Sequence, residues 1–323
     1  MGKFDHIIEK NEAALEAWEN ARKAEKDDKD KVTAIHWYGK TIELAPDFPD
    51  AYFKRGMILY VIGKHPDAFV DFSKAIELGS DDLNAFYNRS KIYYSRGQLD
   101  ESEKDLKAII EMYSLYPEAY ADLGDICIAK GDTKKAKEYY DAAIERETES
   151  YNTYFMRGQM YILDGDLEKA LETLNWGQKL NPTDNILYFL RGNCYYEMGD
   201  LDAAMKEYDK AVFVNRAYAD AYYKMGCVYY DQGDYQKAMK AFTVLSELIP
   251  DSETGYYSRG LSYLAAEDFE KANEDFEKAI SIYDGDGSAF YLLSQAYLGK
   301  GDAEKGKENL DKALALGFEI PEE

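Results

Sequence analysis

The chain repeats itself every 34 residues, and this period restricts the possible folds more than any other feature of the sequence. The stretch AYYKMGCVYYDQGDYQKAMKAF, from Ala221 to Phe242, recurs with substitutions along the chain, for example as AYFKRGMILYVIGKHPDAFVDF from Ala51. Eight consecutive units tile residues 49–320 without an insertion or deletion, starting at residues 49, 83, 117, 151, 185, 219, 253 and 287. A fixed period of this length is typical of arrays in which each unit buries its apolar face against its neighbours.

Each unit places its apolar and small residues at helical spacing. When the positions of a unit are numbered from 1 to 34, position 4 is aromatic, positions 8 and 20 are small, and position 24 is aromatic or leucine. Positions 4, 8 and 11 are spaced i, i+4, i+7, as are positions 20, 24 and 27, so each set lies along one face of a helix. A Gly-Asp turn, as at Gly165-Asp166, ends the first helix and caps the second. The small residues are expected to let the two helices approach closely, with the aromatic residue at position 4 filling the space beside them.

This pattern resembles the tetratricopeptide repeat, a helix–turn–helix of 34 residues, over the whole of residues 49–320. The resemblance implies an all-α fold, a right-handed superhelical α-solenoid of about nine units with the first helices lining its concave side. Residues 1–48 resemble a degenerate N-terminal unit or cap, in which AIHWYGKTIELAP keeps the register but the polar run EKDDKDK lengthens the turn. Residues 321–323 are left as a tail.

The charge of the chain restricts its partners. Lys and Arg number 39 against 62 Asp and Glu, which gives a net charge of −23. Such a chain repels nucleic acid and anionic lipid, so we expect neither partner and favour neutral or basic ones. No apolar run is long enough to cross a membrane.

No residue pattern indicates catalysis. The three cysteines, Cys127, Cys194 and Cys227, form no CxxC pair and suit a reducing compartment. The histidines match no metal-ligand spacing. We therefore expect buried structural cysteines, no enzymatic activity, no metal and no cofactor. The expected location is cytoplasmic, with a periplasmic one open if a leader was removed, and the regularity of the repeats favours a bacterial or archaeal source.

Arginine at position 7 pairs in the sequence with an acid at position 23. Four of the five units with this arginine carry an acid at position 23, and none of the three units with an apolar residue does. The predicted ion pairs are Arg55 with Asp71, Arg89 with Asp105, Arg191 with Glu207, and Arg259 with Asp275. Each is expected to join the two helices of one repeat or two adjacent repeats, as a structural pair that sets register.

Positions 2, 5, 9 and 12 form a second stripe, next to the core stripe of the first helix. In the family that the sequence resembles, these positions face the groove. They are rich in tyrosine, which offers a large contact area with a polar tip and suits peptide recognition. The predicted groove residues are Phe53, Tyr60, Tyr87, Asn88, Lys91, Tyr94, Asp122, Asp125, Phe155, Gln159, Phe189, Asn193, Tyr196, Tyr223, Tyr230, Tyr257 and Tyr291. The alternative is that some of these aromatic residues pack only against neighbouring helices.

Two smaller features refine the choice of partner. Asp122 and Asp125 interrupt the aromatic stripe and form an acidic notch. Either this notch accepts a Lys or Arg side chain of a partner, or the sequence of this unit has merely drifted. Chaperone-binding members of the family use a two-carboxylate clamp with Lys at position 5, and no unit here has Lys at that position. Binding of a chaperone's acidic C-terminal tail is therefore disfavoured.

The leading interpretation is a non-enzymatic scaffold or adaptor that holds an extended peptide or a helix of another protein in its groove. Two alternatives stay open: a structural protein that forms homo-oligomers through its terminal repeats, and a regulatory subunit of a larger complex. The sequence does not identify the partner, the pathway or the organism.

Overall fold

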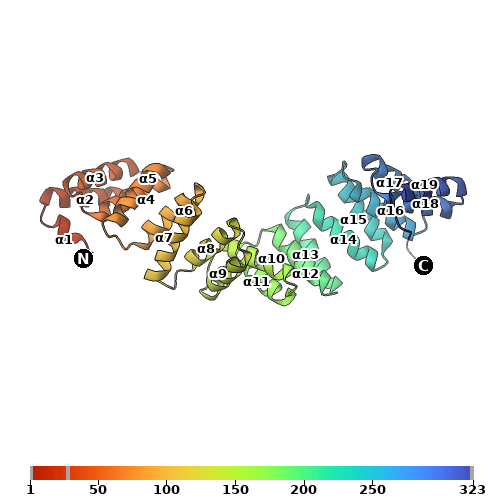
Figure 1. Ribbon diagram of the computed structural model, residues 1–323, viewed down its shortest axis with the longest axis horizontal. Coiled ribbons are helices and arrows are strands. Elements are labelled where there is room, and N and C mark those ends of the chain that lie inside the picture. The colour runs from red at the N-terminus through yellow and green to blue at the C-terminus, as the bar shows by residue number, and fades with distance from the viewer. Residues whose placement is uncertain (1–2, 27–29, 321–323) are drawn as a thin grey trace. The chain divides into compact units, whose positions relative to one another are not determined.

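The structure is a computed structural model that describes residues 3–26 and 30–320. This part of the chain forms nineteen helices, α1 to α19, and no strand (Figure 1). The all-α architecture expected from the helical spacing is therefore confirmed. The chain divides into two compact units, Met1–Thr153 and Tyr154–Glu323, and each is described separately. The tail 321–323 and residues 27–29 of the polar run lie outside the described residues.

The first unit consists of a short helix followed by pairs of packed helices. The elements are α1 (Asp5–Ile8), α2 (Glu12–Glu25), α3 (Lys31–Leu44), α4 (Pro49–Val61), α5 (His65–Glu77), α6 (Leu83–Ser95), α7 (Leu99–Met112), α8 (Pro117–Ala129) and α9 (Thr133–Glu145). The degenerate N-terminal segment forms the pair α2 and α3. Trp18 packs between Tyr38 and Phe48, with ring centroids 5.3 and 5.0 Å away, so this pair has an aromatic core of its own.

The second unit continues the same arrangement. Its elements are α10 (Tyr151–Leu163, which begins in the first unit), α11 (Leu167–Leu180), α12 (Asn185–Glu197), α13 (Leu201–Val214), α14 (Ala219–Asp231), α15 (Tyr235–Leu248), α16 (Glu253–Ala265), α17 (Phe269–Ile282), α18 (Gly287–Lys300) and α19 (Ala303–Ala315). From α4 onward, every even-numbered helix begins at the first residue of a repeat, and we call these the first helices. The odd-numbered helices from α5 onward are the second helices.

The turn between the two helices of a repeat follows from two residues. A glycine in the left-handed conformation ends the first helix, as at Gly199 with φ 80°, because this conformation suits a residue without a Cβ atom. The next residue caps the second helix, and the Asp200 side chain accepts a hydrogen bond from Ala203 N. One repeat departs from the pattern, with Glu267 at φ 60° in the place of the glycine.

The core of each repeat lies where position 24 of the second helix meets position 8 of the first. Tyr208 and Phe242 at position 24 are at most 2% exposed. A Cβ atom built on Gly192 would lie 2.5 Å from the Tyr208 ring, and one on Gly226 would lie 2.4 Å from the Phe242 ring. The glycine at position 8 therefore makes room for the ring at position 24, which projects onto it from the second helix. The aromatic residues at position 4 also pack against the core, as Tyr52 and Tyr222 do.

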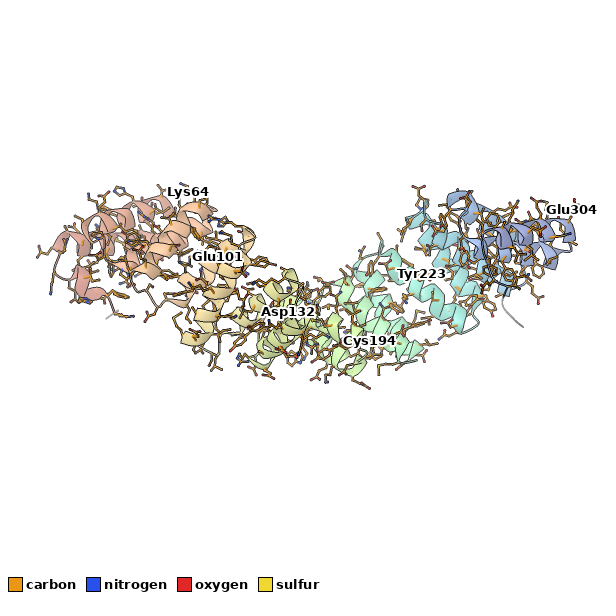
Figure 2. All side chains as sticks on the ribbon, viewed as in Figure 1. Lys64, Glu101, Asp132, Cys194, Tyr223 and Glu304 are labelled. Carbon is orange, nitrogen blue, oxygen red and sulfur yellow. The ribbon has the colours of Figure 1, made fainter. Side chains whose placement is uncertain are left out.

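None of the described helices combines the length and the apolar composition that crossing a membrane requires. Figure 2 shows side chains along both faces of the helices, with Cys194 on α12 and Tyr223 on α14. Cys194 is fully buried, whereas Tyr223 is only partly buried. Tyr223 therefore belongs to the surface on which a site can be sought.

Candidate functional site

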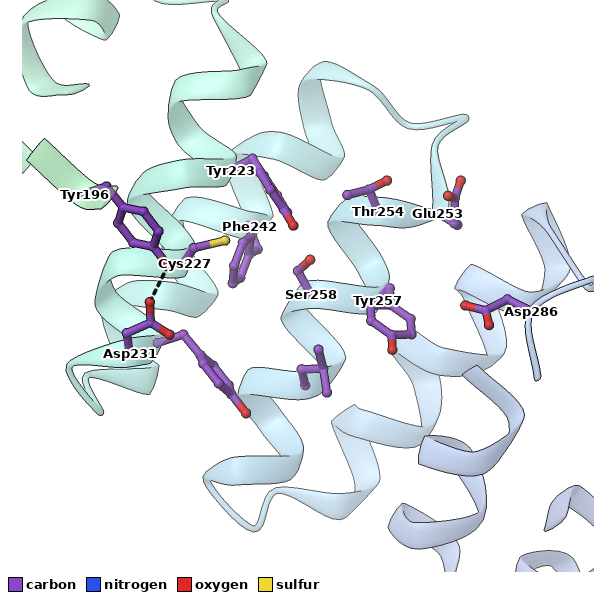
Figure 3. Close-up of a pocket in the computed structure, with 12 residues that line it drawn as sticks. Tyr196, Tyr223, Cys227, Asp231, Phe242, Glu253, Thr254, Tyr257, Ser258 and Asp286 are labelled. Atoms are coloured by element: carbon purple, nitrogen blue, oxygen red, sulfur yellow. Dashed lines mark hydrogen bonds between the residues drawn. The ribbon is translucent and has the colours of Figure 1, made fainter. Parts of the chain in front are cut away.

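A hollow of about 320 Å³ opens among the first helices of the second unit (Figure 3). It lies between α14 and α16, with α12, α15 and the residue that caps α18 at its edges. Its lining residues are Tyr196, Tyr223, Cys227, Tyr230, Asp231, Phe242, Glu253, Thr254, Tyr257, Ser258, Leu261 and Asp286. More than half of them occupy repeat positions 2, 5, 9 and 12, the stripe expected to face a groove.

Tyrosines form the walls of the hollow. The Tyr223 ring packs on Phe242 with centroids 6.2 Å apart, and the Tyr230 ring packs on Tyr235 at 5.4 Å. Tyr257 packs on Phe276 at 6.0 Å, and Tyr196 donates a hydrogen bond of 2.6 Å to Asp231 Oδ2. These contacts hold the rings in place before any ligand arrives, so little side-chain entropy remains to be lost on binding.

The cysteines are unsuited to nucleophilic chemistry. Burial raises the pKa of the Cys227 thiol above its ordinary value, and burial raises the pKa of Cys194 to about 11. A thiol with a raised pKa stays protonated at neutral pH, whereas catalysis and metal binding need the thiolate. The described residues also contain no group of His, Cys, Asp and Glu side chains that could hold a metal ion.

Several lining residues were absent from the predicted groove. They are Cys227, Asp231, Phe242, Glu253, Thr254, Ser258, Leu261 and Asp286. Thr254 lies at position 2 and Cys227 and Leu261 lie at position 9 of the same stripe, so the repeat pattern pointed to them. The remaining residues lie at positions 1, 6, 13, 24 and 34, where only the packing of neighbouring helices brings them to the hollow.

Two predicted groove residues of the first unit, Phe53 and Tyr60 on α4, pack against the second helix of their own repeat, α5. Phe53 is 8% exposed and packs on Phe72 with centroids 6.4 Å apart. Tyr60 packs on the same ring at 6.3 Å and on the His65 ring at 4.8 Å. Among these aromatic residues, Tyr94 is the more exposed, at 43%. Phe53 and Tyr60 therefore contribute to packing between helices, which is the alternative to groove binding that the sequence left open.

A second set in the first unit packs within its own repeat and onto the preceding repeat. Tyr87 packs against Tyr116, with ring centroids 5.6 Å apart. Asn88 donates from Nδ2 to Asn84 O at 2.8 Å and to the Met57 sulfur at 3.3 Å. These two side chains therefore already have partners within the first unit.

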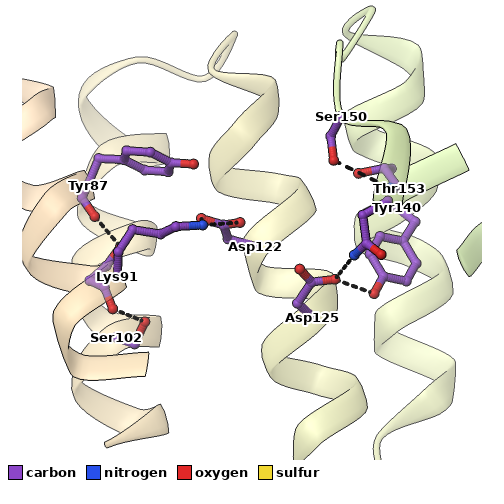
Figure 4. Close-up of polar contacts among 10 residues, drawn as sticks. Tyr87, Lys91, Ser102, Asp122, Asp125, Tyr140, Ser150 and Thr153 are labelled. Atoms are coloured by element: carbon purple, nitrogen blue, oxygen red, sulfur yellow. Dashed lines mark hydrogen bonds and ion pairs between the residues drawn. The ribbon is translucent and has the colours of Figure 1, made fainter. Parts of the chain in front are cut away.

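The acidic notch contains side chains that already have partners within the chain (Figure 4). Lys91 Nζ lies 3.3 Å from both carboxylate oxygens of Asp122. Asp125 Oδ1 accepts hydrogen bonds from Tyr140 at 2.7 Å and from Asn152 at 3.1 Å. Burial raises the pKa of both carboxyl groups in spite of these partners. These residues form an internal polar cluster. Because both carboxylates already have partners within the chain, they are less available to a partner's cation than the sequence suggested.

A pairing between positions 9 and 24 had escaped the sequence reasoning. Where position 24 is tyrosine, its buried hydroxyl needs an acceptor, and position 9 supplies one. Tyr140 donates to Asp125, and Tyr208 donates to Asn193 Oδ1 at 2.8 Å. Repeats with Phe or Leu at position 24 have Met57, Lys91, Gln159, Cys227, Leu261 and Gln295 at position 9. Comparing these two columns of the repeat could have shown that Asp125 and Asn193 serve the core.

The remaining predicted groove residues of the second unit lie away from the hollow. Phe189 packs on Tyr208 and Tyr218, with centroids 5.9 and 5.2 Å apart. Tyr291 stacks on Phe318 at 4.8 Å. Phe155 and Gln159 on α10 are partly buried. Of the predicted groove residues, the structure gathers Tyr196, Tyr223, Tyr230 and Tyr257 around one hollow.

The arginines at position 7 lie against the acids at position 23 of the same repeat. In three repeats the guanidinium donates two hydrogen bonds of 2.6–2.8 Å to the two carboxylate oxygens: Arg55 to Asp71, Arg89 to Asp105, and Arg259 to Asp275. Arg191 Nη2 lies 3.3 Å from Glu207 Oε1, and Nη1 donates to the side chain of Gln178. Each pair joins the first and second helices of one repeat, and none of these four pairs joins two adjacent repeats.

Comparison with protein families gives matches along most of the chain. Models described as "Tetratricopeptide repeat" match residues 87–152, 128–185, 219–252, 254–286 and 287–316, and a model described as "TPR repeat" matches residues 192–233. Two of these matches begin at residues 219 and 287, where repeats begin in the sequence. No curated protein matches the sequence.

Solved structures show the same fold. The C-terminal part of a TPR repeat-containing protein from Cytophaga hutchinsonii is 20% identical, with a TM-score of 0.56 over 76% of this chain and 97% of that one. YrrB, described as a TPR protein with an unusual peptide-binding site, is 24% identical, with a TM-score of 0.54 over 58% of this chain and 97% of its own. A crystal structure of MamA is 28% identical over 50% of this chain and 94% of its own, with a TM-score of 0.47.

Proposed function

The chain belongs to the tetratricopeptide repeat family, whose arrays are protein-interaction modules, and from this premise we propose that it is a non-enzymatic scaffold or adaptor. Its partner is another protein, which presents an extended peptide or a helix to the face formed by the first helices. The hollow between α14 and α16 supports this proposal most directly. A preformed depression with aromatic walls and a few polar groups is the usual form of a ligand site.

The chemistry of the hollow favours binding over catalysis. Tyr223, Tyr230 and Tyr257 offer broad, partly buried ring faces that are fixed by packing from behind. Such residues commonly act as binding hot spots because they bury a large area at a low cost in conformational entropy. The thiol of Cys227 stays neutral for the reason given above.

A displayed peptide library selected on the full chain tests the proposal. The test variant combines Tyr223→Ala with Tyr230→Ala, and the matched control combines Tyr113→Ala with Tyr283→Ala, which are exposed tyrosines outside the hollow. Selected peptides should bind the test variant about tenfold or more weakly, since a truncated aromatic hot spot costs roughly 1–2 kcal/mol. They should bind the control as they bind the parent chain. Equal binding to both variants would refute the groove as the site.

Light scattering on the same samples distinguishes the second candidate, self-assembly through the terminal repeats. That candidate has one observation in its favour: Leu314, Leu316 and Ile320 near the C-terminal end are each close to half exposed, at 47%, 47% and 49%. Stacking of a second copy would bury them. A mass that rises with concentration, together with a failure to select peptides, would favour assembly over peptide binding.

A further inference from the structure

The hollow between α14 and α16 carries negative charge without a basic neighbour in its lining. Asp231, Glu253 and Asp286 line it, and no described lining residue is Lys, Arg or His. Asp286 is engaged, because its two oxygens accept from the backbone and the hydroxyl of Ser288. Asp231 uses one oxygen to accept from Tyr196. Glu253 forms no hydrogen bond or ion pair with any residue that the structure describes.

The lining also contains a hydroxyl group that makes no hydrogen bond within the protein. Ser258 is 8% exposed, and its side chain points into the space beside Tyr223 in Figure 3. Within the described residues its hydroxyl takes part in no hydrogen bond, although the Ser258 backbone carbonyl accepts from Ser262. Because this oxygen is open to the hollow, a ligand there can supply the hydrogen bond that no protein group makes.

The aromatic walls add a second attraction for positive charge. The faces of tyrosine rings attract cations, and a ring within about 6 Å of the charge contributes measurably. The chain already uses this contact at the edge of the hollow, because Lys224 Nζ lies 5.3 Å from the centroid of the Tyr196 ring, which belongs to the lining. Tyrosine faces, free carboxylate oxygens and an unpartnered hydroxyl together match a group that carries positive charge and several hydrogen-bond donors.

We propose that this hollow is a subsite for a cationic side chain, arginine or lysine, of the partner protein. The inference rests on the proposed function, since it assumes that the partner docks on the first helices. A guanidinium can stack on the Tyr223 or Tyr257 ring while its N–H groups donate to Ser258 or to one of the lining carboxylates, Glu253 or Asp231. The net charge of −23 draws a basic segment toward the chain before contact is made.

A pair of short probes tests this chemistry without knowledge of the partner. The probes are Ac-Gly-Arg-Gly-NH2 and Ac-Gly-citrulline-Gly-NH2, which have nearly the same shape but differ in charge. Each is titrated into the full chain carrying 13C-labelled tyrosine rings, and the NMR shifts of Tyr223, Tyr230 and Tyr257 are followed. The arginine probe should give saturable shifts at these tyrosines, and the citrulline probe should give much smaller ones. Added salt should weaken the binding of the arginine probe and leave the binding of the citrulline probe unchanged.

Charge-removing variants complete the test. Glu253→Gln should weaken binding of the arginine probe about two- to fivefold, the range for a solvent-accessible ion pair. Glu270→Gln is the matched control, because Glu270 likewise lies in the first turn of a helix of this unit but outside the hollow. Equal shifts from the two probes, or equal effects of the two variants, would overturn the inference. Because the probes need no natural partner, that failure is distinct from a failure of the peptide library, which would count against the proposed function.

Discussion

Removing the Arg89 guanidinium should cost far more stability than removing the whole ion pair with Asp105. The two side chains are 16% and 5% exposed, and two hydrogen bonds of 2.8 and 2.6 Å join them. Arg89→Met keeps an apolar stem in contact with Phe86 and Tyr93, whose ring centroids lie 6.0 and 5.7 Å from the guanidinium carbon. What the substitution removes is therefore chiefly the partner of a buried carboxylate.

The expected magnitude follows from that burial. Breaking a buried ion pair from one side leaves a charge without compensation and typically costs about 3–5 kcal/mol, whereas replacing both partners with apolar groups is often close to neutral. We therefore expect Arg89→Met to lose about 3 kcal/mol and Asp105→Leu a similar amount. The double variant should lie within about 1 kcal/mol of the parent chain.

Hydrogen exchange of the amides in α6 and α7 is the suitable assay, combined with urea unfolding. Repeat arrays can open one repeat at a time, so a single global midpoint can miss a local loss. Arg216→Met is the control, because Arg216 is exposed and such substitutions usually change stability by less than about 0.5 kcal/mol. Additive losses, in which the double variant loses the sum of the two single variants, would refute the reasoning that the pair is a coupled structural unit.

Two further predictions follow from the packing. Gly192→Ala should lower the free energy of unfolding in urea by roughly 1–3 kcal/mol, because the new Cβ atom would lie 2.5 Å from the buried Tyr208 ring. Gly199→Ser, at an exposed turn, measures the separate cost of a side chain in the left-handed conformation. An unchanged unfolding midpoint for Gly192→Ala would contradict the close approach of the two helices. For pH, burial raises the folded-state pKa of Asp122 above its unfolded value, so the folded state holds this proton more tightly. Stability contributed by this group is therefore present at low pH and lost as pH rises through the folded pKa. Asp122→Asn should reduce that loss in unfolding measured across the acidic range, and an unchanged pH profile would show that the carboxyl group is not perturbed.

The repeat pattern was enough to predict the helices and the pairing of charged residues. Identical spacing in every unit means that each position lies on the same face of its helix, so one argument about the core positions 4, 8, 20 and 24 applies along the array. The arginine and acid at positions 7 and 23 could be paired because they vary together among the repeats of one chain. Positions 9 and 24 vary together in the same way, and their pairing was also accessible from the sequence.

The candidate site was only partly accessible, because spacing assigns a residue to a face of a helix but not to an environment. Tyr60 and Tyr230 share position 12, and each packs on a ring at position 17, His65 or Tyr235. Tyr60 also packs on Phe72, whereas Tyr230 borders the hollow. The difference comes from the neighbouring helices, whose side chains either fill the adjoining space or leave it open. Periodicity within one helix contains no information about that space.

The tertiary structure also brought together groups that are remote in sequence. Asp231 ends α14, Glu253 begins α16 and Asp286 caps α18, and only the stacking of three successive first helices places them around one hollow. The order of residues within each repeat is sufficient for the helices, their turns and their family. Whether a surface is open, charged or already occupied depends on contacts between repeats, which a pattern that repeats within each unit does not encode.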